Sequence, residues 1–364
     1  MFAADFFRHR VVQLPLKRGG GEDFDDFLRR VLEEYVQLVS RLGPLDQVTQ
    51  EIKDNCSLIG EVADDLNETV GRFLVARPTE ASQTLFQAVS KLKPYTTGLY
   101  TQDISGHLHN LYRLRVEDGS PPTSRGEMFH IPFNLRHLVG PQRYSMTGIP
   151  CLYLGGSLYL CWEELRRPAF DRVYVSRFSL ESGEQVNLLD FGFRPLHIAS
   201  LWEHALNSRS PILEQQRKIL AASYGICWPL IAACSIAVRD QRGSFRPEYI
   251  IPQLVLQWVT ESPDHDGVRY SSVNINWHCE NSLALSNFVF PVKSNAKAGV
   301  CPRLRTKFKL TEPVAWQVAE TVYVPGNLPG NFEVEIIKGF RDMYLHTKFF
   351  EMEVRLSKLP HSLI

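Results

Sequence analysis

Residues 142–165 read QRYSMTGIPCLYLGGSLYLCWEEL and contain the most specific pattern in the chain. A turn with Gly and Pro leads into a short apolar run at 151–154, which favours a strand, and an apolar segment after Ser157 favours a helix. Ser157 is a suitable N-cap because its hydroxyl can accept a hydrogen bond from the first helical turn. In that helix Glu164 shares a face with Leu160 and Cys161, so we expect an inward-facing carboxylate that needs polar partners.

The sequence on both sides has short aromatic and β-branched runs that are punctuated by Gly and Pro. We therefore expect an α+β fold, with a mixed β core, surrounding helices and an N-terminal helical unit. Strands are expected at Leu111–Val116, Cys151–Leu154, Val173–Leu180, Ser235–Val238, Val268–Ser271, Asn287–Val292, Pro302–Leu310, Thr321–Val324 and Phe332–Lys338. Helices are expected at Leu158–Leu165, Pro211–Ala222 and Pro252–Thr260.

The first hundred residues differ, because their apolar residues recur at helical spacing. Helices are expected at 22–42, where Gly43 and Pro44 end the pattern, at 47–76, and from Pro78 to about Leu92. We predict an N-terminal helical domain over residues 1–100 and a second domain over 101–364. The polar residues of these helices fit a solvated face, so the helical domain is expected to pack against its neighbour rather than to perform chemistry.

The composition of the chain is that of a folded globular protein. Of its 364 residues, 44% are hydrophobic and 22% are charged, which excludes the disordered and fibrous classes. Lys+Arg and Asp+Glu number 40 each, so no nucleic-acid or membrane partner is expected from charge. The cysteines are widely spread without metal-binding spacing, so no metal is expected. Asp5 stands where a signal peptide would carry basic residues, which favours a cytoplasmic location.

Several separate segments then form an ordered pattern. Arg143 precedes Tyr153 by ten residues, and Glu164 follows Tyr153 by eleven. Farther along come Ile-Pro-Gln-Leu at Ile251–Leu254 and the segment Gly267–Ser272. With a strand beginning at Leu111, this order resembles the RES domain family, which is named for its Arg, Glu and Ser. The resemblance covers about residues 107–292.

Two departures from the family pattern stand out. Gln142 replaces the glycine that usually precedes the arginine, and the interval from Glu164 to Ser272 is long. The long interval implies inserted structure, which could change the acceptor that reaches the site. The N-terminal helices and the segment after about residue 300 lie outside the resemblance.

RES domains are similar in fold to ADP-ribosyltransferases, so the resemblance implies a catalytic domain that consumes NAD⁺ as its substrate. The implied reaction breaks the nicotinamide–ribose bond by hydrolysis or phosphorolysis. Glu164 would stabilise positive charge that develops on the ribose, and Arg143 would bind phosphate. Tyr153 would stack on the cationic nicotinamide, and Ser272 would bond to substrate or hold Glu164. Arg113 is a second candidate for the pyrophosphate.

Other interpretations stay open. The enzyme could transfer ADP-ribose to a protein, or the domain could bind a nucleotide without cleaving it. Arg125 and His130 have a spacing found in some helical ribonucleases, although the flanking prolines disfavour the helix which that motif needs. By analogy with the family, we expect a toxin or antiphage defence effector whose partners are NAD⁺, an antitoxin or regulatory protein, and a second copy of the chain.

Overall fold

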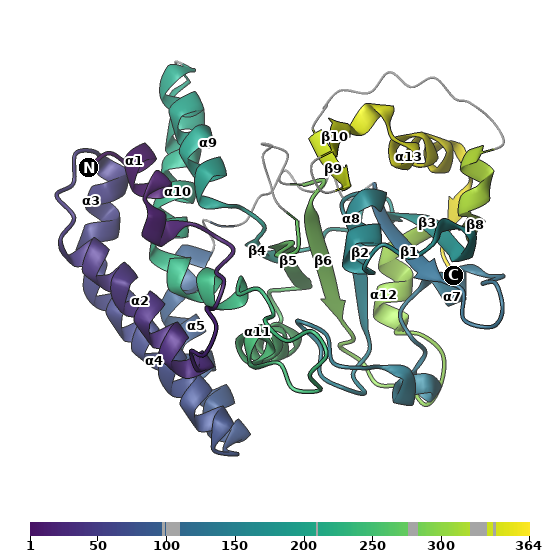
Figure 1. Cartoon of the computed structure of the whole chain (residues 1–364), viewed down its shortest axis with the longest axis horizontal. Coiled ribbons are helices and arrows are strands. Elements are labelled where there is room, and N and C mark those ends of the chain that lie inside the picture. Colours follow the sequence, from purple (N-terminus) through teal and green to yellow (C-terminus); the bar gives the residue numbers. More distant parts are fainter. Residues whose placement is uncertain (97–98, 100–109, 209, 276–282, 321–332, 338–339) are drawn as a thin grey trace. The chain divides into compact units, whose positions relative to one another are not determined.

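The computed structural model describes residues 1–96, 99, 110–208, 210–275, 283–320, 333–337 and 340–364 (Figure 1). The fold is α+β, as predicted. The chain forms two compact units. Unit 1 comprises Met1–Thr101, Gln142–Tyr144 and Leu189–Ser262, and unit 2 comprises Gln102–Pro141, Ser145–Leu188 and Pro263–Ile364.

Unit 1 is built from helices. The prediction of a helix at 22–42 is confirmed, and the segment at 47–76 is two helices that meet at Asn55. Helices α2, α4 and α5 run alongside one another, and α10 packs against α3, α4, α5 and α9 (Figure 1). The bounds are α1 Ala3–Arg8, α2 Phe24–Ser40, α3 Gln47–Asp54, α4 Cys56–Leu74, α5 Pro78–Thr96, α9 Pro195–Asn207, α10 Pro211–Cys234 and α11 Ile250–Glu261. Short 3₁₀ turns cover Arg10–Val12 and Pro247–Tyr249.

Helix α10 extends twelve residues beyond its predicted end at Ala222, through a stretch that is buried all round. Pro229 lies inside it and lacks the N–H that would bond to the carbonyl of Gly225. The Tyr35 hydroxyl of α2 donates to that carbonyl instead, over 2.5 Å. The Tyr35 ring also stacks on Trp228, with ring centroids 4.1 Å apart. A tertiary contact thus satisfies the helix where its sequence predicts a break.

The two units divide the chain differently from the predicted domains 1–100 and 101–364. Residues 189–262 belong with the N-terminal helices, because the buried half of α10 fills the core between them. The expected strand at Ser235–Val238 is wrong: Ile236 forms only an isolated parallel bridge with Leu16, also in unit 1. The helices of the N-terminal segment and those of 189–262 therefore share one hydrophobic core.

Unit 2 is built around an antiparallel sheet in the strand order β11-β7-β3-β1-β2-β6-β5, with β8 paired to β3 (Figure 1). A separate hairpin is formed by β9 and β10. The bounds are β1 Leu111–Val116, β2 Cys151–Gly155, β3 Val173–Leu180, β5 Gly267–Ser271, β6 Ser286–Pro291, β7 Phe308–Thr311, β8 Val314–Ala315, β9 Glu333–Ile337, β10 Phe340–Met343 and β11 His361–Ser362. Strand β4, Leu188–Phe191, begins at the last residue of one stretch of unit 2 and continues in unit 1. The predicted strands at β1, β2, β3, β5, β6 and β9 are confirmed within two residues at each end.

Each face of this sheet has its own hydrophobic core, because side chains alternate along a strand. One face packs Tyr112 and Leu114 against α8 (Leu158–Glu164) and α13 (Lys348–Lys358). The other packs Leu111 against α7 (Arg125–Met128) and α12 (Pro302–Lys307). Short 3₁₀ turns cover Phe133–Leu138, Phe170–Arg172, Trp316–Glu320 and Tyr344–His346.

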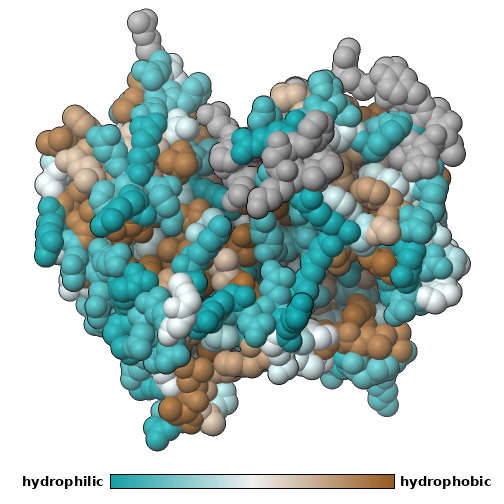
Figure 2. Space-filling model, viewed as in Figure 1, coloured by the Kyte–Doolittle hydropathy of each residue, from teal (hydrophilic) through white to brown (hydrophobic). Residues whose placement is uncertain are grey.

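The C-terminal segment corrects one further prediction. The strand expected at Pro302–Leu310 is wrong over its first half, where α12 begins with Pro302 at a favourable first position before β7 follows. Thr321–Val324 lies outside the described residues. Among the described helices, none has the length and apolar character needed to cross a membrane. Hydrophilic residues predominate over the visible surface, with hydrophobic ones scattered among them (Figure 2).

Candidate functional site

Glu164 ends helix α8 and is held by two side-chain amides. Asn287 on β6 donates its Nδ2 hydrogen to Oε1 over 2.9 Å, and Asn274 donates its own to Oε2 over 3.2 Å. These are the polar partners that the inward-facing position required. Among the described residues Glu164 has no cationic partner, whereas its neighbour Glu163 is paired with Arg167 at 2.7 Å. Of the two adjacent carboxylates, only Glu164 retains an uncompensated charge.

The segment before Glu164 explains how α8 is placed. The Ser157 hydroxyl accepts from the Leu160 N–H, as its N-cap assignment predicted, and donates to the carbonyl of Ala284 over 2.7 Å. Gly155 and Gly156 are needed for close approach. A Cβ on Gly155 would lie 2.6 Å from the Cys161 sulfur, and one on Gly156 would lie 1.9 Å from a backbone oxygen. Gly155 thus lets the helix lie close to the sheet, and Gly156 lets the backbone of Leu283 approach.

Tyr153 and Asn287 share the sheet face on which α8 packs. In the β2–β6 pair, Tyr153 lies opposite Val289 and Gly155 lies opposite Asn287, so Tyr153 and Asn287 are diagonal neighbours. Gly155 also pairs with Tyr112 of β1, whose side chain belongs to the core beneath α8. The Tyr153 hydroxyl donates to the Ser145 hydroxyl over 3.1 Å. The structure therefore brings Tyr153 to the same side of the sheet as Glu164.

Ser272 is connected to Glu164 through Asn274. Ser272 follows the end of β5 and is 1% exposed. Its hydroxyl accepts the backbone N–H of Asn274 over 3.2 Å, and Asn274 in turn donates to Glu164. This turn places the exposed side-chain amide of Asn274 at the carboxylate of Glu164. Ser272 therefore supports the position of Glu164 indirectly, through Asn274.

Arg113 leaves β1 on the opposite face, next to Leu111. Its Nη1 donates to the backbone oxygen of Tyr153 over 2.7 Å, and its Nε is buried without a described partner. Burial, with the positive charge of Arg115 nearby, lowers the pKa of Arg113 to about 10. Arg113 therefore links two strands, β1 and β2, and its part in binding pyrophosphate stays a prediction.

Arg143 belongs to unit 1, whereas the other predicted site residues belong to unit 2. It is 8% exposed. Its Nη1 donates to the carbonyls of Cys234 and Ile236, and its guanidinium lies 5.3 Å from the ring centre of Tyr249. Among the described residues no carboxylate pairs with it. Unit 1 thus holds Arg143 as a buried cation, and its approach to Glu164 stays a prediction.

A second carboxylate lies at the other end of α8. One oxygen of Glu353, on α13, accepts the N–H of Leu158 over 2.7 Å and the Tyr344 hydroxyl over 2.5 Å. Burial raises the pKa of Glu353 to about 8 against the lowering effect of these two donors. This contact joins the C-terminal segment to the helix that carries Glu164.

The residues of the ribonuclease alternative have structural partners here. His130 is fully buried, its Nε2 accepts the N–H of Cys301 over 2.8 Å, and its Nδ1 lies 2.8 Å from the carbonyl of Ile131. Burial lowers the pKa of His130 to about 4. Arg125 is the first residue of the four-residue helix α7, and its side chain is paired with Glu312. Neither side chain is placed to act on RNA, which argues against this alternative.

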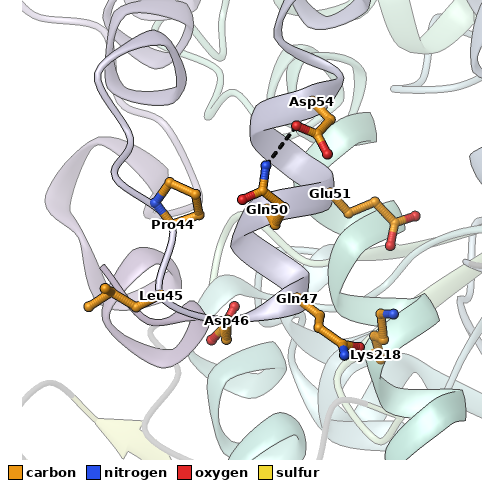
Figure 3. A pocket seen from close by; sticks show the side chains of 8 residues that line it. All are labelled: Pro44, Leu45, Asp46, Gln47, Gln50, Glu51, Asp54 and Lys218. Carbon is orange, nitrogen blue, oxygen red and sulfur yellow. Dashed lines mark hydrogen bonds between the residues drawn. The ribbon is translucent and has the colours of Figure 1, made fainter.

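A surface pocket in unit 1 contains none of the predicted site residues (Figure 3). Within it Asp46 caps α3, and Gln50 donates to Asp54 over 2.8 Å. Its lining residues are Pro44, Leu45, Asp46, Gln47, Gln50, Glu51, Asp54 and Lys218. In the described part of the chain no three His, Cys, Asp or Glu residues are grouped so that they could hold a metal ion. The described geometry thus makes Glu164 the centre of the candidate site.

The chain has a relative in Bacillus subtilis (strain 168), whose name is "Putative toxin YopC". The two are 32% identical over 317 residues, which cover 85% of this chain and 69% of that protein. The chain belongs to the YopC family. No family model and no solved structure matches the chain. The resemblance to RES domains therefore stays a prediction for this YopC-family chain.

Sequence reasoning missed three residues that this site uses in the YopC-family chain: Asn274, Asn287 and Glu353. Asn287 opens a strand that was predicted, but its role depends on a partner 123 positions away. Asn274 belongs to an exposed turn, and Glu353 lies on a helix that was not predicted. Their common property is contact with α8, which becomes visible only in three dimensions.

Proposed function

We propose that the chain is a toxin that consumes NAD⁺ by breaking its nicotinamide–ribose bond, with an ADP-ribosyltransferase-like unit 2 as the catalytic part. The observation that carries this is the Glu164 carboxylate, which two neutral amides orient and which no described cation neutralises. The relative whose name includes "toxin" supports the biological role. The motif order that resembles RES domains supports the substrate.

Cleavage of the nicotinamide–ribose bond needs little from the protein beyond the negative charge of Glu164. Nicotinamide leaves a positively charged bond as a neutral base, so no general acid is required, and the ribose becomes oxocarbenium-like as in glycoside cleavage. A carboxylate whose charge is already oriented stabilises that cation without reorganising at the moment of reaction. Glu164 bonded to an arginine would have lost much of this effect, whereas amide donors leave the negative charge in place.

The remaining predicted residues take supporting roles. Tyr153, on the sheet face shared with Asn287, offers an aromatic ring to the cationic nicotinamide. Ser272 maintains the turn that brings Asn274 to the carboxylate. Arg143, a buried guanidinium without a described carboxylate partner, keeps the phosphate-binding role that the resemblance implies.

The test is incubation of purified protein with NAD⁺, with nicotinamide release followed by chromatography and the products identified by mass with and without phosphate. ADP-ribose indicates hydrolysis, ADP-ribose 1″-phosphate indicates phosphorolysis, and added mass on a protein indicates transfer. Binding of NAD⁺ without nicotinamide release would support a non-catalytic module and contradict the proposal.

The toxin role has its own test in cells. Induced expression of the wild type is expected to deplete NAD⁺ and to stop growth, because turnover continues as long as substrate is present. Glu164→Gln should relieve both effects at equal protein levels. Growth arrest that persists in this variant with NAD⁺ intact would assign the toxicity to another activity.

A further inference from the structure

The two amides that hold Glu164 differ in how firmly they are fixed. Asn287 is 7% exposed and lies within paired strands, opposite Gly155 on one side and Tyr270 on the other. Asn274 is exposed, and its place is set by one hydrogen bond to the Ser272 hydroxyl. The buried contact is also the shorter, at 2.9 Å against 3.2 Å.

The cost of breaking each contact differs for the same reason. An amide donor left without a partner in a buried place loses both water and the carboxylate, which typically costs about 1–3 kcal/mol. An exposed amide can turn to water at little cost. Asn287 is therefore expected to stay on Oε1, while Asn274 can leave Oε2 to another donor.

We propose that Asn287 is a positioning residue that fixes the Glu164 carboxylate, and that Asn274 is an exchangeable donor which yields its place on Oε2 to a ribose hydroxyl of the substrate. This inference rests on the proposed function. In the free protein Asn274 stands in for the substrate hydroxyl and keeps the carboxylate oriented. On binding, the hydroxyl replaces a neutral donor with another neutral donor, so the charge of Glu164 is preserved for the reaction.

The inference separates the kinetic effects of the two asparagines. Removing the Asn287 donor should lower kcat about tenfold to a hundredfold with little change in KM, because orientation in the transition state is lost. Removing the Asn274 donor should lower KM about twofold to threefold, because substrate no longer displaces it.

The experiment measures kcat and KM for nicotinamide release from NAD⁺ with Asn287→Leu, Asn287→Asp and Asn274→Ala, between pH 5 and 8. Asn134→Asp is the matched control, because it makes the same chemical change at an exposed position. The Oδ1 of Asn134 accepts a hydrogen bond from the N–H of Gly299, and an aspartate can accept the same bond. Thermal unfolding and circular dichroism check that each variant is folded.

Asn287→Asp gives a signature that a purely structural role would not produce. It places a carboxylate against Glu164, and two carboxylates at hydrogen-bond distance share a proton as the pH falls. The nearby Glu163 is paired with Arg167, and Cys161 is buried with its pKa raised to about 12 by desolvation, so this thiol stays neutral in the range tested. Activity relative to the wild type should therefore rise towards pH 5 for Asn287→Asp, but not for Asn287→Leu.

The possible results are distinct. If the wild type releases nicotinamide but folded Asn287→Leu keeps its kcat, or Asn274→Ala raises KM, the inference is overturned while the proposed function stands. If the wild type releases no nicotinamide, both are overturned. The expected pattern is a lower kcat in both Asn287 variants, acid recovery in Asn287→Asp alone, and a lower KM in Asn274→Ala.

Discussion

A carboxyl group lies at each end of helix α8, and the two groups differ in their surroundings. At its first residue, Leu158 donates to Glu353, a partly buried group whose pKa is raised by desolvation to about 8. At its last residue, Glu164 is partly exposed and held by two amides. One carboxyl group anchors the helix and favours its neutral form, and the other is presented with its charge. Stability and proposed chemistry are thus assigned to different ends, which can be tested separately.

The largest effect on stability is expected from pH acting on Glu353. Its pKa is raised from 4.5 to about 8 on folding, so its stabilising contribution is complete below pH 4.5 and is lost as the pH rises through about 8. Glu353→Gln keeps a neutral acceptor and removes this dependence. Between pH 5 and 8 the variant should gain on the order of 3 kcal/mol in unfolding free energy relative to the wild type. Urea titrations that stay parallel across this range would contradict the assignment.

Truncation at the same end should also be costly. Glu353→Ala leaves the Leu158 N–H and the Tyr344 hydroxyl without their acceptor. We expect a loss of about 2–3 kcal/mol at pH 5, where the wild-type group is neutral in the folded state. Urea unfolding at pH 5 measures it. Tyr344→Phe keeps the bond between Leu158 and Glu353, so it should cost less than Glu353→Ala.

A smaller loss is expected at the N-cap. Ser157→Ala removes the acceptor of the Leu160 N–H and the bond to Ala284. The expected cost is about 1–2 kcal/mol, as for other N-cap serines. Ser157→Asp, which can still cap the helix, should recover part of this loss. Equal stability of Ser157→Ala and the wild type would show that the cap does not stabilise α8.

The smallest stability effect is expected at Glu164, although its activity effect should be large. Glu164→Gln keeps the shape of the side chain on a partly exposed helix end, so the unfolding free energy should change by less than about 0.5 kcal/mol. Thermal unfolding measures it. A loss as large as that of Glu353→Ala would mean that Glu164 is a structural residue, and the contrast between the two ends would fail.

Local sequence patterns predicted the strands and helices in which apolar and polar residues recur at a regular spacing. The strands at Leu111–Val116 and Val173–Leu180 were predicted to the residue, and α2 within two residues at each end. Helix α10 was predicted too short, because a helix buried on all sides has no amphipathic period and Pro229 suggests a stop. The hydroxyl that compensates for Pro229 comes from Tyr35, far away in the sequence.

In the candidate site, too, the features set by local sequence could be predicted, and those set by contacts between distant segments could not. Glu164 and its N-cap could be located from a single segment, because helical spacing fixes the face on which Glu164 lies. Asn274, Asn287 and Glu353 could not, because strand register and the docking of α13 bring them to α8. The reaction, the substrate and the roles of Arg143 and Arg113 stay predictions.

The most direct test is the rate of nicotinamide release from NAD⁺ by Glu164→Gln and by Glu163→Gln, two isosteric changes at adjacent positions. Loss of one transition-state electrostatic contact typically lowers the rate a hundredfold to a thousandfold, which we expect for Glu164→Gln. Glu163→Gln weakens the ion pair with Arg167 and leaves the Glu164 carboxylate and both of its amide donors in place, so its rate should stay near that of the wild type. Equal rates for the two variants would contradict the assignment of the reaction to Glu164.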